Sequence, residues 1–268
     1  MFNIKKYLPF LRANLMSMFI YRGTIWLWVM VDLFQFVMMI FLWRSVYAYN
    51  DVIQGFTFNE MLIYFLLVNL FFLVTQVDTL FIMSEEIKEG RMSLYLVKPI
   101  SYRLRLVFEN LGRVIGGLIL ILPIVFLTGL VLTLVFNMVW SVTWIQVSLA
   151  LLFLPLMFML MHEFYFLFGT LVIYTANEFG LAIFLNVLVQ VSSGQLIPLA
   201  LYPSWMIQIL KYLPFRFITY PPQILLGKIE ATEALMGLGI LGLWVLAFMI
   251  INHLIFRFSL KKMVVFGG

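Results

Sequence analysis

Between two long apolar stretches the chain reads Ser84-Glu85-Glu86-Ile87-Lys88-Glu89-Gly90-Arg91-Met92-Ser93-Leu94-Tyr95-Leu96-Val97-Lys98-Pro99-Ile100. Charge is concentrated in this run, although only 11% of all residues are charged and 64% are hydrophobic. A water-soluble domain needs far more charge to cover its surface. The contrast indicates that the flanking apolar stretches cross a membrane. The polar run then lies outside the bilayer, as a docking surface and not as the lining of a pore.

Six stretches of the chain are long and apolar enough to be membrane spans, which need about 20 residues for a hydrocarbon core of about 30 Å. The predicted spans are residues 23–44, 60–83, 107–136, 144–174, 179–199 and 234–256. With a mean hydropathy of +1.08, they predict an all-α polytopic membrane protein whose residues 1–268 form a single transmembrane domain. The connecting loops leave no room for a soluble catalytic domain. The absence of cysteine excludes disulfides, thiolate metal sites and thiol catalysis.

The distribution of basic residues predicts the orientation. Twelve of the 17 lysines and arginines lie before the first span, between the second and third, or after the last. Only Lys211, Arg216 and Lys228 lie in loops on the opposite side. Short cytoplasmic loops are enriched in basic residues, so both termini are predicted to be cytoplasmic. Anionic lipid headgroups also explain basic residues beside spans, and no nucleic acid is needed as a partner.

Two further segments have a distinctive pattern. In residues 1–22, apolar residues recur at helical spacing with basic residues between them, which predicts a helix lying in the membrane interface. Pro9 leaves a disordered basic tail as the alternative. Residues 200–233 are too apolar for an ordinary loop, and Trp205 suits the outer aromatic belt. Gly194 and Pro198 can turn the backbone back toward the bilayer, so this segment is predicted to be external or re-entrant. A tight polar turn is predicted at residues 175–178.

The charged run and its setting are similar to a known family. An acidic helical segment, then Gly90-Arg91, then a stop at Lys98-Pro99 lies between the second and third of six spans, behind an interfacial helix. This pattern resembles the permease subunits of type-2 ABC exporters, most closely their small six-span bacterial members, over essentially the whole chain. In that family the corresponding loop forms a coupling helix in a groove of a cytoplasmic ATPase.

The resemblance implies that residues 84–106 are the ATPase-coupling segment. The residues on or beside the coupling helix would be Glu85, Glu86, Lys88, Glu89, Arg91, Lys98 and Pro99. Proline cannot continue a helix, so Pro99 is expected to end it. The alternative is that these charges only hold a loop in the cytosol.

The resemblance also implies an assembly. The chain would pair with a second permease, identical or related, and with two ATPase subunits that hold ATP and Mg²⁺. It lacks the Gly-x-x-x-x-Gly-Lys-Ser/Thr phosphate loop, so it is not expected to be an enzyme or to bind a cofactor. The family implies export of an amphipathic, drug-like or lipid-like substrate from the cytoplasm across a bacterial plasma membrane, in contact with its lipids.

Several polar residues fall within the predicted spans, where they need protein or water as neighbours. Asp32 and Gln35 share one face of the first span. Three interpretations are open. The two residues form a polar patch on the transport path, they contact a basic residue such as Arg113, or they form a buried structural hydrogen-bonded pair. Glu109 and Arg113 are four residues apart, with the acid first, which predicts a structural ion pair.

The fourth and fifth spans carry a second polar set. His162 and Glu163 are adjacent, so they lie about 100° apart on a helix and do not form one metal-binding face. Polar packing inside the bundle or a proton relay would explain them. Gln190 and Ser193 can join helices by hydrogen bonds or contact a substrate.

Two functions from other classes compete with the exporter. An ion-coupled secondary transporter would use Asp32, His162 and Glu163 as proton sites and would run without ATP. A membrane-embedded lipid-processing enzyme would need acids, bases or nucleophiles converging at one depth. The scattered positions of these residues argue against the enzyme.

Overall fold

The structure is a computed structural model that describes residues 4–138, 141–172 and 178–266. Within these ranges the regular secondary structure is helical apart from one hairpin, as predicted for an all-α protein. The α-helices are α1 (Leu8–Ile20), α2 (Arg22–Val46), α3 (Phe58–Leu73), α4 (Thr79–Lys88), α5 (Arg91–Leu96), α6 (Tyr102–Phe136), α7 (Trp144–Leu171), α8 (Glu178–Ser193), α9 (Ser204–Leu210), α10 (Tyr220–Leu225) and α11 (Ala231–Phe266). The hairpin pairs β1 (Val52–Ile53) with β2 (Phe56–Thr57), and 3-10 turns cover Ile4–Lys6, Leu199–Leu201 and Pro214–Thr219. Of the turn predicted at residues 175–178, all but the last residue lies outside the described ranges.

Four helices are long and apolar enough to cross a membrane, namely α2, α6, α7 and the Ala231–Leu260 part of α11. They correspond to the first, third, fourth and sixth predicted spans. Helices α3 and α8 occupy the positions of the second and fifth, but each has only 16 residues. At about 1.5 Å per residue they extend roughly 24 Å, less than the hydrocarbon core. Four of the six predicted spans therefore have full length and two are shorter apolar helices.

The prediction of one continuous helix over residues 60–83 is wrong, because the chain breaks between α3 and α4. The Thr75 hydroxyl donates to the carbonyl of Phe72 at 2.6 Å. The backbone N–H of Asp78 donates to Oδ1 of Asn110 in α6 at 2.8 Å. Side chains thus satisfy backbone groups that would otherwise need a continuous helix, which is what allows irregular backbone inside a helix bundle.

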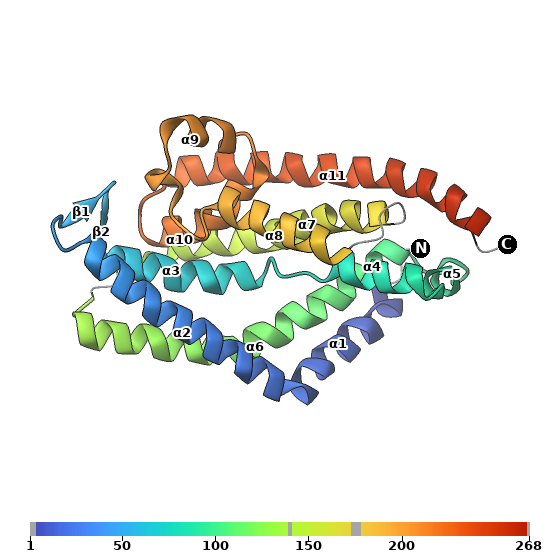
Figure 1. Ribbon diagram of the computed structural model, residues 1–268, viewed down its shortest axis with the longest axis horizontal. Helices are drawn as coiled ribbons and strands as arrows, with labels where there is room; N and C mark the ends of the chain where they lie inside the picture. Colours follow the sequence, from blue (N-terminus) through green and yellow to red (C-terminus); the bar gives the residue numbers. More distant parts are fainter. Residues whose placement is uncertain (1–3, 139–140, 173–177, 267–268) are drawn as a thin grey trace.

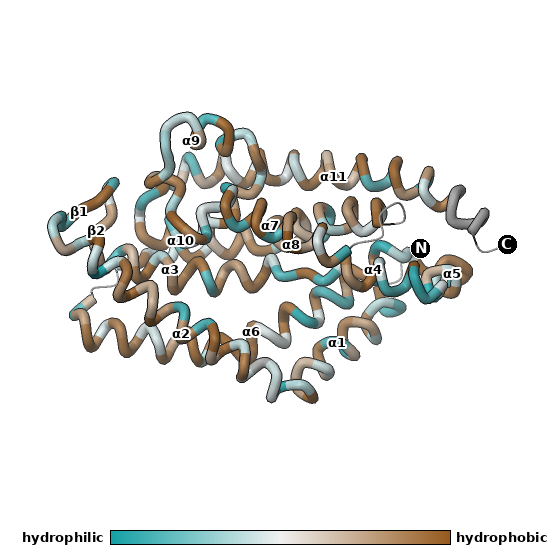
Figure 2. The backbone as a smooth tube through the Cα atoms, in the orientation of Figure 1, coloured by the Kyte–Doolittle hydropathy of each residue, from teal (hydrophilic) through white to brown (hydrophobic). Residues whose placement is uncertain are grey.

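The helices run roughly along the long axis of the molecule, in two groups (Figure 1). Helix α7 packs against α11, α4 and α10, while α6 packs against α1 and α3. The start of α1 and the end of α11 lie near α4 and α5, and the hairpin and α9 lie toward the opposite end (Figure 1). Figure 2 shows hydrophobic residues along the long helices and hydrophilic residues around α4. The start of α1 and the end of α11 thus share the side of the charged segment.

The N-terminal segment is a helix packed against α6, so the disordered-tail alternative is wrong. Pro9 lies in the first turn of α1, where its missing N–H leaves no hydrogen bond unmade. Gly112 of α6 allows the close approach, since a Cβ there would lie 2.2 Å from the carbonyl oxygen of Leu11. The hydroxyl of Tyr7 also accepts a hydrogen bond from the backbone N–H of Ser101 at 2.8 Å. Whether α1 lies in the membrane interface stays a prediction.

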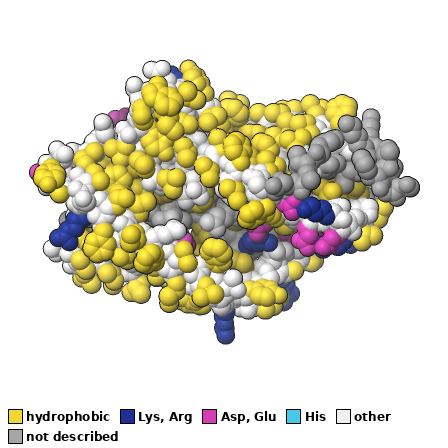
Figure 3. All heavy atoms as spheres, viewed as in Figure 1, with side chains coloured by type: hydrophobic (Ala, Val, Ile, Leu, Met, Phe, Trp, Pro, Cys, Tyr) yellow, Lys and Arg dark blue, Asp and Glu magenta, His cyan; other side chains and the backbone are white. Residues whose placement is uncertain are grey.

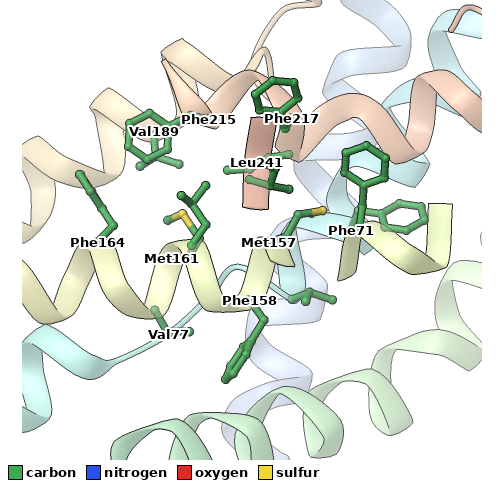
Figure 4. Packing of buried hydrophobic residues seen from close by; sticks show 14 of the residues in the cluster. Phe71, Val77, Met157, Phe158, Met161, Phe164, Val189, Phe215, Phe217 and Leu241 are labelled. Carbon is green, nitrogen blue, oxygen red and sulfur yellow. The ribbon is translucent and has the colours of Figure 1, made fainter. Parts of the chain in front are cut away.

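The main core surrounds α7 and includes the segment after α8 (Figure 4). The chain turns at Gly194, whose φ of +84° is in the left-handed region that glycine adopts readily. The freed carbonyl of Gly194 accepts from the hydroxyl of Tyr64 at 2.8 Å, and that of Ser193 accepts from Thr219 at 2.7 Å. The 3-10 turn Pro214–Thr219 and α10 are therefore buried among the helices. Their depth relative to a bilayer stays a prediction.

Candidate functional site

The predicted coupling segment, residues 84–106, folds as the end of α4, a turn, α5 and the start of α6. Gly90 makes the turn with a φ of +71°, which an L side chain rarely adopts. Figure 3 shows acidic and basic side chains gathered around α4 and α5 on a face that is otherwise largely hydrophobic. This end of the molecule is therefore suited to water and to a polar partner.

Exposed ion pairs cover this end. Arg91 of α5 pairs with Glu85 at 2.8 Å and also with Glu89. Lys88 pairs with Glu178 at 2.5 Å and thereby joins α4 to α8. The hydrogen bond from Lys88 lowers the pKa of Glu178 below its ordinary value. Solvent screens these pairs, so their contribution to stability is small and their charges remain available to a partner.

Apolar side chains of the same segment are also exposed. Leu94 is 59% exposed and Val97 is 83% exposed. The ammonium of Lys98 lies 4.8 Å from the centre of the Tyr95 ring, and Pro99 follows at the surface. Exposed leucine and valine side chains that are surrounded by charged residues are typical of a surface that contacts another protein.

Glu86 is the member of the predicted coupling set that the structure places in the interior. Its Oε2 atom accepts from Arg105 at 2.6 Å and from the hydroxyl of Tyr102 at 2.7 Å. Arg105 is 1% exposed and also pairs with Glu109 at 2.7 Å. Its guanidinium lies 3.7 Å from the centre of the Tyr95 ring. This buried cluster joins α4, α5 and α6, and it removes Glu86 from direct contact with a partner.

The predicted ion pair between Glu109 and Arg113 is wrong. Glu109 pairs with Arg105 and not with Arg113, although both arginines are four residues away from it. Arg113 instead pairs with Asp78, at the break between α3 and α4. Consequently Arg113 is not the partner of Asp32. Spacing on one helix permits several such pairs, and the packing of α4 against α6 decides among them.

His162 and Glu163 belong to two separate buried networks. The Nδ1 atom of His162 lies 3.1 Å from the hydroxyl of Thr79 in α4. The carboxylate of Glu163 accepts from Nε of Arg103 and from Nδ2 of Asn252, each at 2.8 Å. One network joins α7 to α4 and the other joins α7 to α6 and α11, which is the polar packing that the sequence suggested.

The other predicted polar residues gather around a cleft of about 380 Å³ formed by α1, α2, α3, α6 and the end of α8. Asp32, Gln35 and Gln190 line it. A second cleft of about 300 Å³ shares Gln190 and reaches the break between α3 and α4. Ser193 is buried instead, and its hydroxyl donates to the carbonyl of Gln190 at 3.3 Å. The structure thus brings Asp32, Gln35 and Gln190 together and places Ser193 in the helix packing.

Arg103, Arg105 and Asn252 are site residues that the sequence did not predict. Arg103 and Arg105 served only as basic residues that indicate the orientation, although the four-residue spacing from Arg105 to Glu109 was a usable signal. No local pattern marks Asn252, because its partner Glu163 lies 89 residues away in the chain. Among the residues that the structure describes, no group of three histidine, aspartate or glutamate side chains could hold a metal ion.

Comparison with known proteins agrees with the resemblance to ABC exporters. No curated protein matches the sequence. Residues 33–267 match the family described as ABC-2 family transporter protein, which confirms the predicted family. This match covers most of the chain, from the middle of α2 to beyond the last described residue. The chain therefore belongs to the ABC-2 family of transporters, as one of its membrane permeases.

Proposed function

We propose that this chain is the permease subunit of an ATP-driven exporter and that α5 with the end of α4 docks on a separate ATPase subunit. The observation that carries the proposal is the exposed surface formed by Glu85, Glu89, Arg91, Leu94 and Val97. It combines unburied apolar side chains with charges of both signs, at the end of the molecule where α1 begins and α11 ends. Such a mixture is typical of a protein interface with an apolar centre and a polar rim.

The buried cluster below this surface supports a coupling role. Arg105 joins Glu86 of α4 to Glu109 of α6 without exposure to water. A displacement of α5 by a closing ATPase would therefore move α6, and with it α1. The ATPase must bind two conformations of the permease with different affinities for this to drive transport.

The proposed assembly holds two copies of the ATPase, which bind ATP and Mg²⁺, and a second permease that is identical or related to this chain. Six membrane crossings, with α3 and α8 as the short ones, would leave both termini on the same side of the membrane. The distribution of basic residues favours the cytoplasm of a bacterium as that side. The substrate leaves the cytoplasm and is amphipathic, drug-like or lipid-like.

Affinity purification of the tagged chain from its native membrane in mild detergent tests this function. We expect an ATPase with a phosphate loop to co-purify. Glu86 is left unchanged because it is buried, and the test variant combines Leu94→Asp with Val97→Asp. Both side chains are exposed, so the fold should survive while docking is lost.

The matched control is Val52→Asp, which places the same charge on a 56% exposed valine in the hairpin at the opposite end. Loss of the ATPase in the test variant and its retention in the control would support the docking surface. Equal recovery in both variants would contradict the docking surface, and no ATPase with the unaltered chain would contradict the exporter.

A further inference from the structure

Asp32 differs from the other acidic side chains of the helix bundle. It lies in the middle of α2, ten residues from Arg22 and twelve from Arg44. A carboxylate at such a position is unfavourable by several kcal/mol unless it faces protein, water or a positive charge. Among the residues that the structure describes, Asp32 makes no hydrogen bond or ion pair, and no lysine, arginine or histidine lines its cleft.

Four other acidic groups of the bundle are each neutralised by a basic partner. Glu60 pairs with Lys228, Asp78 with Arg113, Glu109 with Arg105, and Glu163 with Arg103. The described part of the chain therefore supplies a positive partner at each of those positions and none at Asp32.

A second acceptor in the same cleft lacks a donor. The side-chain oxygen of Gln195, after α8, is inaccessible to solvent and has no hydrogen-bond partner among the described residues. Asp32 and Gln195 come from elements far apart in the sequence, and both residues line this cleft, although only the Asp32 carboxylate opens into it. A ligand that pairs with this carboxylate carries a positive charge, or N–H or O–H donors.

The other residues that line the cleft favour a ligand with a large apolar part. Trp28, Phe36 and Phe72 lie on the wall together with uncharged amides such as Gln35. Aromatic rings bind organic cations through their negative faces. A bare metal ion is a poor fit, since one carboxylate and a few amides do not replace the six or more oxygens of its shell. The volume of about 380 Å³ lies in the range of small-molecule sites.

We propose that this cleft binds an amphipathic organic cation, with Asp32 as the counter-ion of its positive group. The inference rests on the proposed permease function and narrows its substrate class. An ammonium could belong to a soluble compound or to a lipid headgroup, and the test distinguishes these two sources.

The test measures binding of tetraphenylphosphonium to the purified full-length chain in dodecyl maltoside micelles, which contain no amine. This probe keeps its charge at every pH, and tetraphenylborate has the same shape with the opposite charge. We expect Asp32→Asn to weaken phosphonium binding by about tenfold or more, the scale of one charged contact. Asp32→Glu should retain most of the binding. Asp51→Asn, in the exposed bend just before β1, should have no effect.

Added phosphatidylethanolamine that displaces the probe, where phosphatidylglycerol does not, would identify a lipid amine as the natural occupant. Displacement by neither lipid would identify a soluble cation. Equal phosphonium binding by Asp32→Asn and the unaltered chain would overturn the site, and so would equal binding of the borate. Because this assay uses the permease alone, its failure leaves the ATPase co-purification unaffected, and failure of the co-purification leaves a measured cation site in place.

Discussion

Replacement of Arg105 by leucine tests the buried cluster that joins α4 to α6. The guanidinium is 1% exposed and forms two ion pairs, at 2.6 Å with Glu86 and at 2.7 Å with Glu109. Two charged hydrogen bonds contribute about 1.5–3 kcal/mol each. Removing one partner of a buried ion pair lowers stability by about 3–5 kcal/mol, because the other charge stays buried and unpaired. We therefore expect Arg105→Leu to lower the free energy of unfolding by about 3–5 kcal/mol.

The measurement is unfolding of the purified chain in mixed micelles of dodecyl maltoside and increasing sodium dodecyl sulfate, followed by circular dichroism. The matched control is Arg91→Leu. Arg91 also bridges two carboxylates, but it is exposed, so this substitution should lower the free energy of unfolding far less. Combining Arg105→Leu with Glu86→Gln and Glu109→Gln should recover much of the lost stability, because no charge is then stranded. Equal effects of the two arginine variants would refute the reasoning, and so would a triple variant no more stable than Arg105→Leu.

Two further predictions concern the contacts of α1 and α8. Gly112→Ala should loosen α1 from α6, because the new Cβ would lie 2.2 Å from the backbone oxygen of Leu11, whereas Gly239→Ala, with nothing within 4 Å, should be neutral or stabilising. Thermal unfolding of the two variants compares them, and equal midpoints would contradict the close approach. The lowered pKa of Glu178 means that its ion pair with Lys88 is fully formed above pH 4.5 and is lost as the pH falls through that lowered pKa. The protection of α8 backbone amides against hydrogen exchange, relative to their intrinsic rates, should therefore stay constant above pH 4.5 and fall only below it. This fall should be absent in Lys88→Met.

Long apolar runs made most of the helical framework predictable. The predicted spans that became α2, α7 and α11 begin within a few residues of the observed helices. Hydropathy alone could not predict the break between α3 and α4. That break depends on Asn110, which accepts a hydrogen bond from the backbone of a residue 32 positions earlier. The sequence does not distinguish a polar side chain that faces lipid from one that faces a cleft or an unpaired backbone group.

The sequence by itself determined the class of this protein, the positions of its long helices and its charged segment, because hydrophobicity and helical spacing act locally along the chain. The tertiary structure alone decided which charges meet. Glu85 and Glu86 are neighbours in the same charged run, yet the first faces water and the second is buried against Arg105. It also decided that Asp32 has no partner among the described residues, because an ion pair within a bundle depends on which helix faces which. That arrangement comes from the packing of the whole chain.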